Sequence, residues 1–93
     1  MRQYEVMLIL PPDAEASVGA VVEKVGAALG DQGSVGKVDD WGRRRLAYEI
    51  EHQHEGHYVV VEFDADPSAL TELDRSLSLA DQVMRFKVVY RAA

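Results

Sequence analysis

The sequence predicts an α+β fold in which a four-stranded antiparallel sheet carries two helices on one face. Two segments repeat apolar residues at the three- and four-residue steps of amphipathic helices, and four segments show the alternation or the apolar runs of strands. Their order along the chain is strand, helix, strand, strand, helix, strand. A length of 93 residues with 47% hydrophobic residues suits one core, so residues 1–93 are predicted to form a single domain.

The first half of the chain begins with a strand and continues into a helix. The strand is predicted over residues 2–10, where every second residue belongs to one apolar face: Tyr4, Val6, Leu8 and Leu10. Pro11 and Pro12 end it, and Asp13 is expected to be the N-cap of the helix. The apolar stripe of that helix is Val18, Val21, Val22, Val25 and Leu29. The helix should end near Gly30.

The middle of the chain predicts an antiparallel hairpin. The pattern becomes extended from Val35, a bulge is expected at Trp41-Gly42, and alternation follows at Leu46, Tyr48 and Ile50. The polar run 52–56 ends in glycine and leads directly into the apolar strand 57–63. This third strand suits the centre of a sheet, whereas the arginines of the second strand suit an edge.

The last third supplies the second helix and the fourth strand. Asp66 followed by Pro67 predicts a helix start, and the buried stripe is Leu70, Leu73 and Leu77. The last strand alternates an apolar face with a basic row of Arg85, Lys87 and Arg91. Right-handed crossovers then favour the ferredoxin-like βαββαβ arrangement with spatial strand order 2-3-1-4. In that order the first and last strands are neighbours, which should bring Arg2 beside Arg91.

Charge is distributed unevenly along the chain. Ten Lys and Arg residues oppose 16 Asp and Glu residues, which gives a formal net charge of −6. An evenly spread negative charge would argue against nucleic-acid binding. The residues Arg43, Arg44 and Arg45 are consecutive, however, and on a strand Arg44 should project opposite to its two neighbours. This triplet either protects an exposed edge strand from aggregation or contacts phosphate or a partner surface.

Composition excludes several classes of protein. The absence of cysteine excludes disulfides and thiolate metal sites. No apolar run approaches the roughly 18 residues of a membrane span, and the first ten residues lack a secretory cleavage site. We therefore expect a cytoplasmic protein with no membrane partner.

Catalysis finds little support in the sequence. It contains no glycine-rich phosphate loop, nucleophile elbow or cysteine nucleophile. The acylphosphatases share the predicted strand order, but they need a glycine-rich anion-binding loop with an arginine after the first strand. Here the segment Pro11-Pro12-Asp13 occupies that place and would repel phosphate. The protein is therefore predicted not to be an enzyme, with no small-molecule substrate and no cofactor.

Three histidines near the hairpin raise the possibility of a metal site. His52, His54 and His57 lie within six residues, and imidazoles two residues apart on a strand can point to the same side. The sequence provides no fixed fourth ligand. A solvated hairpin explains the same residues more simply, so no metal site is predicted.

A free-standing module that binds single-stranded RNA is the alternative function. RNA-recognition motifs have the same topology and stack bases on aromatic residues of their first and third strands. Residues 56–63 resemble the third-strand signature only at its end, in Val61-Glu62-Phe63, and Val60 stands where an aromatic residue is needed. Packing within the sheet is therefore the favoured role of Tyr58 and Phe63.

The segment from Trp41 to Ile50, WGRRRLAYEI, resembles the signature of the bacterial small-subunit ribosomal protein S-six family. That pattern runs glycine, any residue, basic, polar, leucine, small, tyrosine, any residue, isoleucine. The opening residues 2–6 and the closing segment 79–85 are similar to the same family, so the resemblance covers essentially the whole chain. It implies the ferredoxin-like fold that the residue pattern predicts independently.

The resemblance implies a structural constituent of the bacterial small ribosomal subunit. Such a protein pairs with the small basic ribosomal protein S-eighteen and binds the central domain of the small-subunit ribosomal RNA. We predict the RNA-binding residues from the two neighbouring chain ends: Arg2, Arg85, Lys87 and Arg91. We predict the partner-protein-binding residues from the second, edge strand: Trp41, Arg43, Arg45 and Tyr48. Strand parity groups Tyr48 with Leu46 and Ile50, which are expected to be buried.

Overall fold

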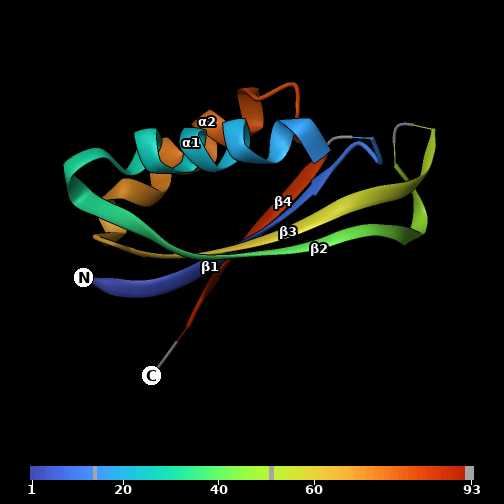
Figure 1. Cartoon of the computed structure of the whole chain (residues 1–93). Helices are drawn as coiled ribbons and strands as arrows, with labels where there is room; N and C mark the ends of the chain where they lie inside the picture. Colours follow the sequence, from blue (N-terminus) through green and yellow to red (C-terminus); the bar gives the residue numbers. More distant parts are fainter. Residues whose placement is uncertain (14, 51, 92–93) are drawn as a thin grey trace.

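The computed structural model describes residues 1–13, 15–50 and 52–91. Its main elements are β1 (Arg2–Leu10), α1 (Val18–Leu29), β2 (Gly33–Ile50), β3 (Gln53–Ala65), α2 (Leu70–Leu79) and β4 (Arg85–Tyr90). The strands form an antiparallel sheet in the order β2-β3-β1-β4, and both helices cover the same face of it (Figure 1). The predicted fold class and strand order are confirmed.

The hydrophobic core lies between the sheet and the two helices. Alternate residues of β1 and β3 meet the apolar stripes of α1 and α2 there, because a strand sends successive side chains to opposite faces. The buried members are Tyr4, Val6, Leu8, Leu10, Val21, Val25, Leu29, Val59, Val61, Phe63, Ala65, Ala69, Leu73 and Leu77. Both predicted helix stripes therefore face the core, with Val18, Val22 and Leu70 at its margin.

The hairpin formed by β2 and β3 is irregular. Its register shifts between Val35 and Val38, between Asp40 and Gly42, and between Arg45 and Ile50. The predicted bulge at Trp41-Gly42 is confirmed, and Gly42 adopts a φ of 76° there, which glycine tolerates best. The strand β2 lies at the edge of the sheet and β3 lies inside it, as predicted.

The two helices begin differently. The residue Asp13 is not the N-cap of α1, because a 3-10 turn at Glu15–Ser17 intervenes and Ser17 holds the cap position without a side-chain hydrogen bond. At the second helix the prediction is confirmed, since Asp66 accepts a hydrogen bond from the Ser68 amide at 3.0 Å. Hydrogen bonds from the Ser68 amide and hydroxyl lower the pKa of the Asp66 carboxyl. This cap starts the 3-10 turn Pro67–Ala69, which leads into α2.

The first residue of β2, Gly33, lies where a larger residue has no room. A β-carbon there would sit 2.4 Å from the backbone oxygen of Asp64. We expect Gly33→Ala to lower the free energy of unfolding by about 2 kcal/mol, since the strands must move apart. In contrast, a β-carbon at Gly19 on α1 meets open space, so Gly19→Ala should raise the free energy of unfolding by about 0.5 kcal/mol. Urea denaturation measures both, and equal effects would contradict the close approach.

Candidate RNA and protein interface

The face of the sheet opposite the helices, called the open face below, carries side chains of mixed chemistry. The register of β3, β1 and β4 forms rows across it, such as Tyr58, Ile9 and Arg85 in one row and Val60, Met7 and Lys87 in the next. Further along the same strands lie the acidic residues Glu5, Glu62 and Asp64. The open face is therefore apolar and basic at one end and acidic at the other.

The predicted basic row of β4 lies on the open face, but its members differ in their surroundings. The side chains of Arg85 and Lys87 are exposed, and among the described residues neither forms an ion pair with a carboxylate. The guanidinium of Arg91, in contrast, pairs with Glu62 and lies 3.8 Å from Glu5. Two cations are thus available to a phosphate, while the third is already neutralised by its neighbours.

The predicted cluster of Arg2 with Arg91 is wrong at the level of side chains. The strand ends are neighbours, since the Arg91 amide donates to the Gln3 carbonyl at 2.9 Å. However, the Arg2 guanidinium lies over the Tyr90 ring, 5.6 Å from its centroid. That ring packs against Tyr4, which belongs to the core side of the sheet. Strand alternation therefore separates Arg2 from the open-face row, and the four predicted RNA-binding residues do not form one patch.

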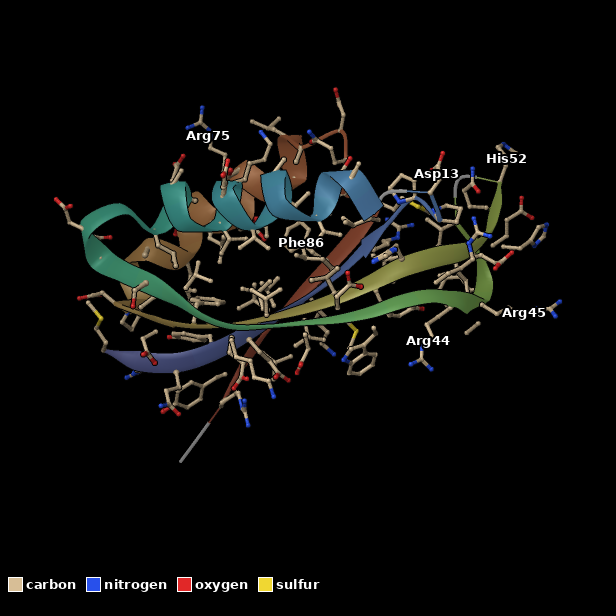
Figure 2. The ribbon with its side chains drawn as sticks, viewed as in Figure 1. Asp13, Arg44, Arg45, His52, Arg75 and Phe86 are labelled. Carbon is tan, nitrogen blue, oxygen red and sulfur yellow. The ribbon has the colours of Figure 1, made fainter. Side chains whose placement is uncertain are left out.

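The bulge of β2 presents an aromatic side chain together with an arginine. Trp41 is 47% exposed, and the Arg44 guanidinium lies 6.0 Å from the centroid of its ring. The Arg44 Nε donates to the Trp41 carbonyl at 3.4 Å. Figure 2 shows Arg44 pointing away from the helix layer, so this pair belongs to the open face. Sequence reasoning did not select Arg44 as a binding residue, although its predicted projection opposite to its neighbours was the available signal.

The other two arginines of the triplet lie elsewhere. Arg43 and Arg45 pair in register with His57 and Glu55, whereas Arg44 pairs with Gly56, so the three alternate as predicted. The Arg43 side chain lies 3.8 Å from Glu55. In Figure 2, Arg45 points outward at the end of the hairpin. The structure therefore does not bring these two residues onto the surface that carries Trp41.

Tyr48 lies on the same side of the hairpin as Ile50, as strand parity predicts, because both side chains line one cavity. Leu46 and Ile50 are buried, but Tyr48 is 71% exposed. Tyr48 lies in the stretch between Arg45 and Ile50, where the register of β2 and β3 is irregular. The cavity lies over the open face, and besides Tyr48 and Ile50 it is lined by Met7, Ile9, Arg85 and Lys87. It is therefore an accessible aromatic group at the apolar and basic end of that face.

The three histidines are not brought together. His57 is buried, and its Nε2 lies 2.6 Å from the Asp40 carboxylate, whereas His52 and His54 are exposed. Within residues 1–13, 15–50 and 52–91, no three histidine or acidic side chains gather in a metal-binding arrangement. The buried histidine is instead part of the contact between β2 and β3.

The aromatic residues of β3 do not form a base-stacking surface. Phe63 is 2% exposed and stacks on Tyr4 within the core, with 5.5 Å between the ring centroids. The predicted role of Phe63 in sheet packing is confirmed. Tyr58 lies on the open face but is only partly exposed.

Neither α1 nor α2, the α-helices of the described residues, is long and apolar enough to cross a membrane.

The fold and the mixed open face define a small ferredoxin-like protein whose exposed sheet is suited to contacts with macromolecules. The family described as "Ribosomal protein S6" matches residues 3–90. The small ribosomal subunit protein bS6 of Saccharopolyspora erythraea is 50% identical over 93 residues, covering 98% of this chain and 79% of that protein. The bS6 protein of Moorella thermoacetica is 46% identical over 90 residues, covering 95% and 92%.

A solved structure agrees with these sequences. The crystal structure of 30S ribosomal protein S6 from Thermotoga maritima superposes with a TM-score of 0.84 at 32% identity, covering 97% of this chain and 87% of that one. The chain belongs to the ribosomal protein S6 family, which is the family that its WGRRRLAYEI signature predicts. It is accordingly a ribosomal protein of the small-subunit type.

Proposed function

We propose that this chain is a structural constituent of the small ribosomal subunit in the cytoplasm, where residues 1–93 act as one domain without catalysis. In this proposal it binds the central domain of the small-subunit ribosomal RNA together with the basic ribosomal protein S-eighteen. The observation that carries the assignment is the family match, which extends over residues 3–90. The charges of the open face support the finer statement about RNA and partner.

The RNA surface that we propose centres on the basic row of β4. Phosphate contacts by lysine and arginine supply most of the affinity of such interfaces. Arg85 and Lys87 are exposed and have no carboxylate partner among the described residues, so a phosphate need not displace an internal ion pair. Arg91 can join them only by leaving Glu5 and Glu62. Arg2 would contact RNA from the other side of the same sheet edge.

The partner-protein surface that we propose is the edge strand β2 with the neighbouring open face. Exposed aromatic and arginine side chains are enriched at interface hot spots, and Trp41, Arg44 and Tyr48 provide them. The net charge of −6 attracts a basic protein and repels RNA. Binding of the basic partner should therefore come first, and binding of RNA second.

The test measures RNA binding with and without the partner. The purified chain alone should bind a central-domain RNA fragment weakly, and addition of S-eighteen should raise the affinity by at least tenfold at moderate salt. The tagged chain should also sediment with the small ribosomal subunit. Recovery only as free protein, with an RNA affinity unaffected by the partner, would overturn the proposal. Tight binding of short single-stranded RNA by the chain alone would instead support the RNA-recognition module.

The acidic pair around Arg91 leads to a prediction of its own. Replacing Glu62 by glutamine removes the carboxylate that pairs with Arg91 and a charge that repels phosphate. We expect Glu62→Gln to raise the RNA affinity of the partner complex about threefold at moderate salt. The control is Glu72→Gln, which removes the same charge from the Glu72–Arg75 pair on α2. Equal gains from both variants would show that only net charge matters.

A further inference from the structure

Trp41 lies in a bulge of the edge strand β2, and bulges commonly redirect a side chain at sheet edges. A bulge interrupts the backbone ladder, so the residues within it are not held by regular strand pairing. The register of β2 and β3 breaks between Asp40 and Gly42, and Trp41 is the residue in between. Another interaction must therefore determine where this side chain lies.

A single carboxylate oxygen supplies that interaction. Oδ1 of Asp40 accepts a hydrogen bond from the Gly42 amide at 2.9 Å and lies 2.6 Å from Nε2 of His57. The first contact closes the bulge around Trp41, and the second joins it to β3. Since Asp40 is half-exposed and His57 is 2% exposed, the pair connects the surface of the edge strand to the interior.

The histidine is suited to act as a fixed donor. Its Nδ1 is buried and has no hydrogen-bond partner among the described residues. A ring proton at Nδ1 would therefore remain unsatisfied, whereas a proton at Nε2 has the Asp40 carboxylate as its acceptor. Nε2 accordingly carries the proton and donates it in a charge-assisted hydrogen bond, which is stronger than a neutral one.

The same connection continues to the surface. The carbonyl of Trp41, the residue between Asp40 and Gly42, accepts from Arg44 Nε at 3.4 Å. The Arg44 guanidinium also lies over the Trp41 ring. A chain of contacts thus runs from buried His57 through Asp40 and the bulge to the exposed Trp41–Arg44 pair.

We propose that Asp40 and His57 are positioning residues that hold Trp41 and Arg44 in place as a preformed docking element for the basic partner protein. The inference rests on the proposed function. Preformed side chains lose less conformational entropy when a partner binds, so the gain appears as affinity. Neither positioning residue needs to touch the partner, because the bulge transmits their effect to Trp41.

The experiment compares neighbouring aspartates. Asp40→Ala removes the acceptor of both hydrogen bonds and should weaken binding of purified S-eighteen about tenfold. Asp39→Ala causes the same change in charge at the neighbouring position and should leave the affinity within about twofold, because among the described residues Asp39 pairs only with exposed Lys37. Asp40→Asn keeps an oxygen acceptor at the same place and should recover most of the affinity. Calorimetry gives the affinities.

A spectroscopic readout separates positioning from general stability. Trp41 is the only tryptophan of the chain, so its fluorescence reports on the bulge directly. Its emission and anisotropy should change in Asp40→Ala and remain as in the wild type in Asp39→Ala and Asp40→Asn. If Asp40→Ala fails to fold in urea titrations, Asp40→Ser tests the His57 contact alone, since serine can accept from the Gly42 amide but does not reach His57, and partner affinity should still fall.

The outcomes distinguish the inference from the function on which it rests. Failure of the wild-type chain to bind S-eighteen would overturn the proposed function and the docking role with it. If the wild-type chain binds S-eighteen and Asp40→Ala changes neither the affinity nor the Trp41 fluorescence, the inference alone is overturned. A loss of affinity that Asp39→Ala reproduces would assign the effect to charge and would also overturn it.

Discussion

Replacing Tyr48 by alanine is expected to weaken binding of the basic partner protein about 30-fold, which corresponds to a hot-spot loss of about 2 kcal/mol. The side chain is 71% exposed and lies at the rim of a shallow cavity with Met7 and Ile9 as apolar neighbours. A partner that covers it would bury a large aromatic surface on an already apolar floor. Calorimetric titration of the folded variant with S-eighteen measures the effect.

The matched control for Tyr48 is Leu79→Ala. Leu79 has the same exposed fraction of 71% but belongs to α2, on the opposite side of the sheet. Its replacement should leave partner affinity within about twofold, and both variants should unfold at urea concentrations close to that of the wild type. If Tyr48→Ala and Leu79→Ala bind the partner equally well, the hairpin and the open face are not the protein interface.

The second large effect is expected from the basic row. The double variant Arg85→Ala, Lys87→Ala should weaken RNA binding by the partner complex about tenfold at physiological salt and lower the salt slope by about two. Two exposed cations that have no ion-pair partner among the described residues are lost, and in the proposed interface each supplies one phosphate contact. Because phosphate contacts carry no base information, unrelated RNA sequences should be affected equally. Filter binding over a range of salt concentrations provides both quantities.

A charge-matched control separates local contacts from net charge. Lys24→Ala with Arg75→Ala also removes two cations, but from the helix layer, and Figure 2 shows Arg75 pointing away from the sheet. These replacements should leave the salt slope unchanged. An equal fall in slope for both double variants would mean that RNA does not bind specifically at the β4 row.

The strand order and the core could be predicted from local pattern. The two-residue alternation of β1 and β4 and the helical steps of Val21, Val25 and Leu73 assign each side chain to a face before any long-range contact is known. Right-handed crossovers then leave few topologies, and the observed order is the simplest of them. The bulge was also predictable, because glycine tolerates the positive φ that Gly42 adopts.

The sequence could not predict how exposed each side chain of the irregular hairpin is. Strand parity groups Tyr48 with Leu46 and Ile50, yet Tyr48 is 71% exposed while the other two are buried, in a stretch whose pairing with β3 is irregular. The same limit applies at the chain ends. The adjacency of β1 and β4 was predictable. However, Tyr4 pairs with Tyr90 on the core side of the sheet, so Arg2, two residues from Tyr4, lies on that side, whereas Arg91, one residue after Tyr90, lies on the open face.

The sequence by itself determined the family, the fold and the unequal distribution of charge. Only the tertiary structure decided which charged side chains are free to bind a ligand and which side chains hold others in place. Arg91 is neutralised by two carboxylates from β1 and β3, and Asp40 reaches across to His57, 17 residues away in the sequence. Local periodicity describes how one element presents its faces, whereas these contacts depend on register between strands that are distant in sequence.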